Sequence, residues 1–475
     1  MELYISEFSK YVITLLMVLY TWECFSVFRF QEESRRSGVY ARQNILMFAL
    51  HFSCFVVICF ETSDVTYLFF YAFQQIILYA AIVLFRMLYP KSNRLVVNNM
   101  CTLLSISFVI LTRLSYGRAV RQFAIATGSL VIALVIPYFV HKFKFLKNLK
   151  WIYALVGIAA LSVVLILGQT TYGSKLSYSI AGLTFQPSEF VKILFVFYVA
   201  GALCQSSGFF EVFTTAVVAA AHVIVLVCSK DLGSALIFFM VYVLMVYVAS
   251  ERFFYLLAGA VGGSAAAWIA ARVFSHVQVR IQAWQDPWSV IDSAGYQITQ
   301  SLFAISSGGL FGLGLYGGTP DSIPFVEADF IFSAIAEELG IVFAVCLILI
   351  CVSSFIMIMN ISLKLNERFY QLLAFGFGVT YIFQVFLTIG GGTKFIPLTG
   401  VTLPLISYGG SSVLATLVTF SVIEGLSTIQ EDEAAMERKK SRRVRRLQAA
   451  DRRRQEAGEA EKIIRTEEDY EDSEE

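Results

Sequence analysis

The sequence predicts an all-α polytopic membrane protein, and three observations lead to that fold class. Of its 475 residues, 57% are hydrophobic and only 15% are charged. Apolar runs of about 18–25 residues, long enough to cross a bilayer as helices, recur through residues 1–430. The charges collect instead in residues 431–475. A single lipid-embedded bundle followed by a polar tail explains all three.

About thirteen membrane-spanning helices of roughly 20 residues each can be placed along the chain. The N-terminal segment carries Glu2 and Glu7 and lacks a basic start, so the first run is expected to be a retained helix and not a signal peptide. The expected spans are 10–28, 44–61, 66–86, 100–115, 121–140, 150–169, 187–205, 211–228, 232–249, 253–275, 329–360, 369–390 and 403–428.

Lysine and arginine collect on the cytoplasmic side of a membrane protein, so the loops predict the orientation. Basic clusters follow the first, third, fifth, eleventh and thirteenth spans. One cluster, Arg113, Arg118 and Arg121, argues the other way. The majority places the N-terminus outside, the C-terminus in the cytoplasm and a large loop, 276–328, outside between the tenth and eleventh spans.

The tail, 431–475, is expected to be cytoplasmic, partly helical and mostly disordered. About ten lysines and arginines lie between Arg438 and Arg454, and the end of the chain is acidic. The basic run suits anionic membrane lipid. Nucleic-acid binding is not expected, because no aromatic residues or folded module accompany these charges.

The stretch 277–340 interrupts the apolar pattern with charges, Trp, Gly and Pro, and it leads to Asp329. An ionisable residue at the mouth of a membrane helix is a candidate functional group. Apolar neighbours would raise the pKa of its carboxyl toward values useful in a general base. The alternative is a helix N-cap. Glu337 and Glu338 lie two turns deeper and need a partner, either Lys192 or an external arginine.

Three further polar clusters fall beside apolar spans, and each has a structural alternative. In QPSEFVK, Glu189 and Lys192 are spaced to pair on one helix face or to hold an anionic substrate. In SKDLG, Lys230 and Asp231 either cap a helix or join the site. Arg280 could clamp a phosphate or pair with a loop carboxylate, Asp286 or Asp292.

The last cluster is GGGTKFIPLTGVTLPLISYGGSS. Lys394 lies in an irregular stretch bounded by prolines, and Ser411 lies among small residues that permit a groove or close helix packing. The Gly-rich stretch near 308–318 lacks the strand–turn–helix context of a nucleotide site. The four histidines show no metal-ligand spacing, so no metal site is predicted from protein ligands.

These motifs, in this order, resemble the SEDS family (shape, elongation, division and sporulation), the group of RodA, FtsW and SpoVE. The matching runs are GLTFQPSEFVK, DLGSA, the GYQITQS to DFIFSAIAEELG block and PLTGVTLPLISYGGSS. The family has ten transmembrane helices, so spans four to thirteen match it. The chain thus divides into added N-terminal helices (1–99), a SEDS membrane domain (100–430) and the tail.

The resemblance implies a peptidoglycan glycosyltransferase of the bacterial cytoplasmic membrane, working in elongation, division or sporulation. It would polymerise lipid II at the outer face, with Asp329 as general base and inversion at the anomeric carbon. Lys192, Arg280 and Lys394 are candidates to stabilise the leaving diphosphate, and a divalent cation such as Mg²⁺ or Mn²⁺ could share that role. The remaining candidate substrate-binding residues are Glu189, Lys230, Asp231 and Ser411.

The resemblance also implies a partner, a class B penicillin-binding protein that crosslinks the strands. Two other functions stay open at this point. A polar cavity inside a polytopic bundle suits a transporter that flips lipid II. A scaffold that only positions a penicillin-binding protein would not need costly intramembrane carboxylates.

Overall fold

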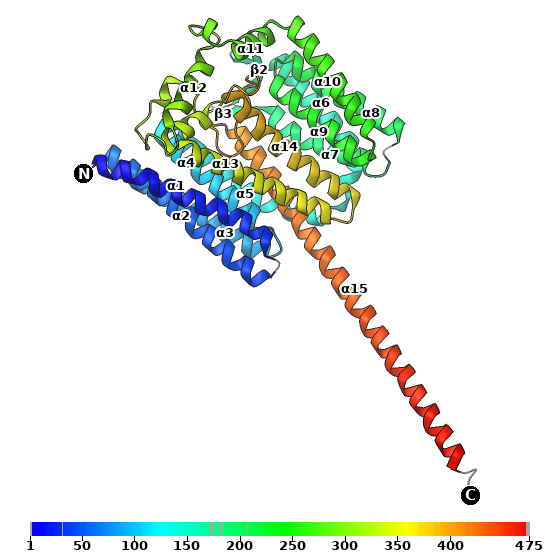
Figure 1. The fold of residues 1–475 in the computed structure, drawn as a ribbon. Helices are drawn as coiled ribbons and strands as arrows, with labels where there is room; N and C mark the ends of the chain where they lie inside the picture. The colour runs from blue at the N-terminus through cyan, green and yellow to red at the C-terminus, as the bar shows by residue number, and fades with distance from the viewer. Residues whose placement is uncertain (1, 31, 172–173, 181–182, 207, 472–475) are drawn as a thin grey trace. The chain divides into compact units, whose positions relative to one another are not determined.

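The protein, seen in a computed structural model, is described here for residues 2–30, 32–171, 174–180, 183–206 and 208–471 (Figure 1). It comprises two compact units, Met1–Thr428 and Ile429–Glu475. The predicted all-α membrane fold is confirmed. The main helices of the described part are α1 (Glu2–Arg29), α2 (Glu33–Thr62), α3 (Val65–Leu88), α4 (Arg94–Leu114), α5 (Tyr116–Lys142), α6 (Lys150–Leu167), α7 (Pro187–Leu203), α8 (Phe209–Cys228), α9 (Leu232–Ser250), α10 (Phe253–Val273), α11 (Ser275–Gln285), α12 (Tyr296–Gly308), α13 (Ile331–Lys364), α14 (Arg368–Gly392) and α15 (Gly410–Glu471).

Twelve helices in these ranges are long and apolar enough to cross a membrane. The 17-residue helix α7 is close to that length, so the thirteen predicted spans each have a counterpart. Helices α1, α2, α4 and α5 begin several residues earlier than predicted, and two helices begin later. Helix α13 begins at Ile331 and not at 329, and α15 begins at Gly410 and not at 403. Pro404 has no N–H to give a helix, and the chain there runs in turns.

The three N-terminal helices lie side by side in Figure 1 and pack on the rest of the first unit. Helix α1 contacts α2 and α13, while α2 and α3 contact α4. A buried polar cluster joins them at Asn99 of α4, whose Oδ1 accepts from Tyr20 Oη (2.9 Å) and whose Nδ2 donates to Ser353 and Ser354 Oγ (both 2.9 Å). Because buried amides need such partners, this cluster fixes the position of α1 against α4 and α13.

A small antiparallel sheet stands between α6 and α7, where no strand was predicted. Its strands are β1 (Gln169–Thr171), β2 (Ser174–Ile180) and β3 (Leu183–Phe185), in the order β1–β2–β3. The alternation of polar and apolar residues in SKLSYSI is the ordinary signal of a strand. The segment after β3 leads straight into Pro187, the first residue of α7.

The Gly-rich stretch after α12 packs against a break in α13. Gly340 leaves helical geometry (φ 86°, ψ 167°), a conformation that glycine adopts without strain. The backbone groups freed there bond to the Gly-rich stretch, since Leu313 N donates to Glu337 O (3.0 Å) and Ile341 N donates to Gly309 O (3.0 Å). These glycines therefore serve backbone packing, and they set the position of the first turns of α13.

The short 3₁₀ helices complete the first unit: η1 (Lys144–Leu149), η2 (Trp288–Val290) and η3 (Pro320–Ser322). The second unit, Ile429–Glu475, is helical through Glu471 as the later part of α15. The basic run of the predicted tail lies in this unit, on exposed positions where the side chains are described.

Candidate active site

Asp329 lies in the turn immediately before α13, where it is partly buried. Its backbone N donates to Phe325 O (3.1 Å). The stretch 403–409 holds the two preceding carbonyls, because Ser407 Oγ donates to Ala328 O (2.5 Å) and Tyr408 N donates to Glu327 O (2.7 Å). Helix α13 shows no side-chain capping bond. The N-cap alternative for Asp329 is therefore not what the structure shows.

A cavity of about 620 Å³ opens beside Asp329. Several parts of the first unit form its wall: β2, the β3–α7 junction, the α8–α9 turn, α11, the start of α12, the turn before α13 and the segment 398–412. Four of the predicted binding residues join Asp329 in the lining, namely Lys230, Asp231, Arg280 and Ser411. The motifs that are far apart in the sequence thus meet in one place.

Arg280 projects from α11 and is fixed by the backbone of the opposite wall. Its Nη1 donates to Leu398 O (3.1 Å) and Thr399 O (3.0 Å). The predicted alternative partners, Asp286 and Asp292, are not the ones it meets. Gly400 adjoins both Arg280 and Asp329. A Cβ built on this glycine would lie 3.8 Å from Arg280 Nη2 and 3.8 Å from Asp329 Oδ2.

The surroundings shift the pKa values of both groups. Burial raises the pKa of the Asp329 carboxyl to about 6, the Arg280 charge opposes that rise, and the Glu327 charge adds to it. Burial lowers the pKa of Arg280, while the charges of Asp329 and Asp231 oppose that change. Arg280 remains a cation, since guanidinium groups do not deprotonate in proteins. Asp329 can therefore accept a proton, and Arg280 supplies a fixed positive charge in the same cavity.

Asp231 has a structural role as well as a place in the lining. It is the N-cap of α9, where its Oδ1 accepts from Ser234 N (3.1 Å), and its Oδ2 accepts from Ser188 Oγ (3.0 Å). The predicted capping role is confirmed. Lys230, in a left-handed conformation (φ 62°), turns the chain into the cavity wall just before the cap.

Ser411 closes the wall where β3 leads into α7. Its Oγ accepts from Gln186 N (3.0 Å) and donates to Thr184 O (3.2 Å). Gln186, Thr184 and Ser411 all line the cavity. The hydroxyl of Ser411 is thus engaged with the backbone that shapes the site.

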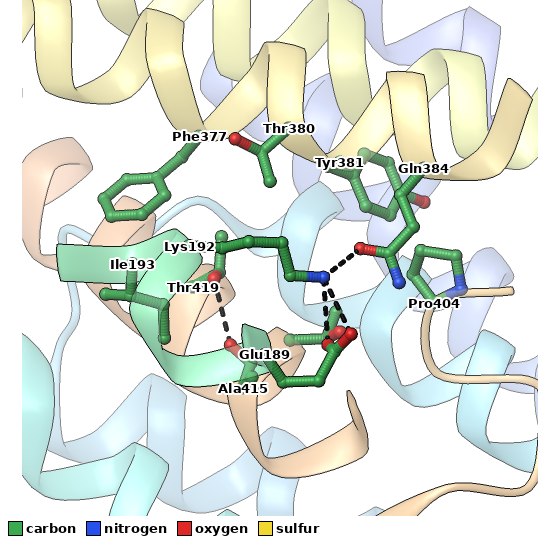
Figure 2. A pocket seen from close by; sticks show the side chains of 11 residues that line it. Glu189, Lys192, Ile193, Phe377, Thr380, Tyr381, Gln384, Pro404, Ala415 and Thr419 are labelled. Atoms are coloured by element: carbon green, nitrogen blue, oxygen red, sulfur yellow. Dashed lines mark hydrogen bonds and ion pairs between the residues drawn. The ribbon is translucent and has the colours of Figure 1, made fainter. Parts of the chain in front are cut away.

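Glu189 and Lys192 form a separate buried cluster, which Figure 2 shows. Lys192 Nζ donates to both carboxylate oxygens of Glu189 (2.9 and 3.0 Å) and to Gln384 Oε1 (2.8 Å). Each of the two charged residues is 5% exposed. They line a small hollow of about 20 Å³ and are not among the lining of the larger cavity. Gln384 Nε2 in turn donates to Thr402 O (3.1 Å), a residue of the larger cavity's wall.

Lys394 lies in the turn after α14 with a positive φ of 60°. Its carbonyl accepts from Trp284 Nε1 (3.1 Å), which ties the turn to α11. Its side chain is not among those that line the cavity. The structure thus brings Asp329 together with four of the seven predicted binding residues, and it places Glu189, Lys192 and Lys394 around that site.

Glu337 and Glu338, the two deeper glutamates, each accept a hydrogen bond, and neither pairs with Lys192. Glu338 Oε1 accepts from Arg113 Nε (2.8 Å), and Arg113 also donates to Gly318 O (3.3 Å). Glu337 Oε1 accepts from Thr319 N (3.0 Å). Of the two predicted partners, Lys192 or an external arginine, Glu338 pairs with an arginine, which lies in the last turn of α4.

Several lining residues were not singled out from the sequence. Trp284 and Gln297 lie in motifs whose charges and glycines drew the predictions, and Thr402 lies between Pro397 and Pro404 of the last cluster. Arg118 forms an ion pair with Glu327, two residues before Asp329. The sequence did hold a signal for this pair. Arg118 was expected on the same side of the membrane as loop 276–328, which contains Glu327, and opposite charges on one side can pair.

A carboxylate and a guanidinium line one cavity at the helix ends of a multi-pass membrane bundle, an arrangement that suits acid–base chemistry. The model of the family described as "Cell cycle protein", that of FtsW, RodA and SpoVE, matches residues 93–432. This chain belongs to that family. The match begins at α4, so α1 to α3 lie outside it.

Curated relatives and solved structures agree with that assignment. The "Peptidoglycan glycosyltransferase RodA" of Mycobacterium tuberculosis (strain ATCC 25618 / H37Rv) is 34% identical over 319 residues, covering 63% of this chain and 68% of the relative. The "Probable peptidoglycan glycosyltransferase FtsW" of Bacillus subtilis (strain 168) is 31% identical over 328 residues, covering 64% and 79%.

Two solved structures share the fold. The rod shape determining protein RodA of Thermus thermophilus has a TM-score of 0.54 at 23% identity, covering 71% of this chain and 96% of that one. A chain from a peptidoglycan synthase complex, described as coordinating polymerization and crosslinking, has a TM-score of 0.62 at 24% identity, covering 72% and 98%. The SEDS family predicted from the ordered motifs is confirmed.

Proposed function

We propose that this chain is a peptidoglycan glycosyltransferase that polymerises lipid II into glycan strands at the outer face of the cytoplasmic membrane. The observation that carries the proposal is the Asp329 carboxylate facing the Arg280 guanidinium in a cavity of about 620 Å³. The names of its relatives in the same family support it. The cavity and its residues support the following assignment of roles.

Asp329 is the general base. It accepts the proton of the acceptor sugar hydroxyl as that oxygen attacks the anomeric carbon of the growing chain. A new C–O bond forms with inversion, the bond to the phosphate oxygen breaks, and the lipid diphosphate leaves with the electron pair. A base works best with a pKa near the working pH, and burial brings the pKa of Asp329 to about 6.

The leaving diphosphate needs positive charge opposite the base. Arg280 supplies it, because its guanidinium is fixed by two backbone carbonyls and faces the same space as Asp329. Lys230 lines the cavity and is the second cation near it. Lys192 is held by Glu189 and Gln384, so its role is to support the wall through Thr402.

The described residues contain no group of three or more acidic, histidine or cysteine side chains that could hold a metal by themselves. Two carboxylates, Asp231 and Asp329, do line the same cavity. Mg²⁺ is often held by one or two carboxylates together with substrate phosphates. We therefore propose that Mg²⁺ or Mn²⁺ enters with the diphosphate, so EDTA should slow polymerisation and added Mg²⁺ should restore it.

The finer cellular assignments are also proposals. This chain, with three helices added before the ten of the family, would place its N-terminus outside and its C-terminus in the cytoplasm, as the basic loops favour. Its partner would be a class B penicillin-binding protein that crosslinks the strands. The fold shared with a chain of a peptidoglycan synthase complex supports such a partner. A cysteine at either terminus, labelled in intact cells by an impermeant reagent, tests the orientation.

A reconstitution and a complementation assay together separate the three candidate functions. Full-length protein in lipid II vesicles, with its partner, should extend lipid II into glycan, and an Asp329→Ala protein should not. Flipping of lipid II without polymerisation, unaffected by Asp329→Ala, would favour a transporter. Full complementation of a depletion strain by Asp329→Ala would favour a scaffold. Asp292→Ala, an exposed loop carboxylate, is the matched control.

A further inference from the structure

A second polar cavity lies at the boundary between the N-terminal helices and the family fold. Its volume is about 140 Å³, and it forms where α2 begins, α3 ends and α4 begins. Helices α2 and α3 lie outside the residues matched by the family model. This boundary cavity is therefore a feature that the added helices create. Its lining consists of Ser37, Tyr40, Ala41, Asn44, Ile82, Phe85, Arg86, Ser92, Arg94, Val97 and Asn98.

Two arginines give the boundary cavity a positive wall. Arg94 Nη1 donates to Ser37 Oγ (3.4 Å), and its guanidinium lies 6.0 Å from the centre of the Tyr40 ring. Arg86, in the last turn of α3, is exposed. Within the described part of the chain neither arginine forms an ion pair, and the lining holds no acidic residue. Two cations on one wall with no ion-pair partner favour an anionic ligand.

The carboxylate at this end of α4 does not neutralise them. Glu424 Oε2 accepts from the Asn93 backbone N–H (2.7 Å) and so caps the start of α4. Glu424 is not part of the cavity lining. The charges of Glu424 and Glu33 act on the lining residue Tyr40, but neither carboxylate forms an ion pair with Arg86 or Arg94. Apart from the contact of Arg94 with Ser37, the donors of the two arginines are therefore open to a ligand.

An unpartnered acceptor also faces this space. Asn44 lines the cavity, and its buried Oδ1 accepts no hydrogen bond from the described residues. Buried polar atoms in proteins are almost always paired, so this oxygen calls for a donor from a ligand or water. The volume is about ten times what one water needs, which leaves room for a phosphate and a neighbouring hydroxyl.

The other side of the lining is apolar, with Ile82, Phe85 and Val97. The cavity stands at three helix ends, which is the level of lipid headgroups whichever way the bundle is oriented. Basic pockets between membrane helices at that level recognise anionic headgroups. We propose that the boundary cavity binds an anionic phospholipid, with its phosphodiester on Arg86 and Arg94 and a headgroup hydroxyl on Asn44.

The test measures phospholipid binding to purified full-length protein by native mass spectrometry in detergent, titrating phosphatidylglycerol, phosphatidylethanolamine and inorganic phosphate separately. Wild type should bind one phosphatidylglycerol saturably and at least about tenfold more tightly than phosphatidylethanolamine. Both lipids offer a phosphodiester to the arginines, but the ammonium of phosphatidylethanolamine would be repelled by the two cations, and phosphatidylglycerol carries only the negative charge. The Arg86→Gln/Arg94→Gln protein should lose that preference. Lys364→Gln, an exposed basic residue at the end of α13, should bind as wild type does.

Three outcomes would overturn the proposal. Equal binding of both lipids would show that the site does not select negative charge. Displacement of phosphatidylglycerol by equimolar inorganic phosphate would assign the site to a soluble phosphate. Unchanged binding in the double variant would place the lipid elsewhere. If the double variant fails to fold, exposed Arg86→Gln decides alone, because wild-type affinity in that protein contradicts the assignment.

Discussion

Arg280 Nη2 and Asp329 Oδ2 each lie 3.8 Å from the point that a Cβ on Gly400 would occupy, so one backbone position adjoins both the cation and the base. Gly400 itself adopts φ +73°, a conformation that glycine accepts without strain. The acid–base pair is thus built around a segment that carries no side chain. Leu398 and Thr399, the two residues before it, hold the guanidinium by their carbonyls.

The first prediction concerns pH. A general base must be deprotonated, so kcat/KM should rise as pH increases through about 6 and level off above it, following the pKa of Asp329. Activity is present above that pKa and lost below it. A pH series of polymerisation by the purified complex checks this. A flat profile from pH 5 to pH 8 would contradict the assignment of Asp329.

Two substitutions should move that inflection in opposite directions. Arg280→Gln removes the charge that lowers the pKa of Asp329, so the inflection should shift to higher pH. Glu327→Gln removes a charge that raises it, so the inflection should shift to lower pH. The shift in each variant's profile relative to wild type is the measurement. Shifts in the same direction would show that the electrostatic account of the pair is wrong.

Gly400→Ala should lower kcat while the protein still folds. A Cβ at φ +73° costs roughly 1–2 kcal/mol of backbone strain and would lie 3.8 Å from each of the two charged groups. Gly409→Ala is the control, because Gly409 lines the same cavity and a Cβ there meets only ordinary contacts at 3.7 Å. Polymerisation rates and thermal melts of both variants test this. Equal rates in the two would remove the special role of Gly400.

Ser407→Ala should disturb the position of Asp329 more than it disturbs substrate affinity. Ser407 Oγ donates to Ala328 O (2.5 Å) and accepts from Leu403 N (2.9 Å), and the serine is 1% exposed. Leaving such buried backbone groups unpaired costs about 1–3 kcal/mol. We expect kcat to fall with little change in KM, and Ser407→Thr to recover part of the rate. A pure loss of stability, with kcat unchanged, would contradict the positioning role.

The buried pair Glu189–Lys192 should behave as a unit in stability measurements. Removing one partner leaves an uncompensated charge at a site where each residue is 5% exposed, at a cost of about 3–5 kcal/mol. Removing both should cost much less. Unfolding of Lys192→Met, Glu189→Gln and the double variant in detergent gives the cycle. Additive losses would indicate that the two side chains do not depend on each other.

Much of this arrangement could be predicted from the sequence because the bilayer imposes length and polarity on each helix. The thirteen spans, the family and the cap at Asp231 followed from apolar runs and local motifs. Residues such as Lys394 could not be placed that way, because whether a loop side chain enters a cavity depends on turns that only the packed bundle fixes. The spacing of Glu189 and Lys192 correctly predicted that they pair. Their place outside the lining of the larger cavity was not predictable, because it depends on α14, which supplies their third partner, Gln384.

Ion pairs between residues far apart in the sequence were the hardest features to predict. Arg113 belongs to the basic cluster that opposes the predicted orientation, but its side chain is only 9% exposed and is paired with Glu338 of α13. The pairing of Arg118 with Glu327 is equally non-local. The small sheet was not predicted because its longest strand has only seven residues and lies between two long apolar runs that dominate the hydropathy pattern. Charge counts in loops ignore such pairs, and only tertiary structure reveals them.

The most direct test of the account is the rate of lipid II polymerisation by purified full-length Asp329→Asn, with its partner and at equal protein levels. Asparagine keeps the shape of the side chain and cannot accept the proton, so the rate should fall at least about a hundredfold, within the range that general base catalysis contributes. Asp292→Asn should polymerise at the wild-type rate. A wild-type rate for Asp329→Asn would contradict the central claim that this carboxylate removes the acceptor's proton.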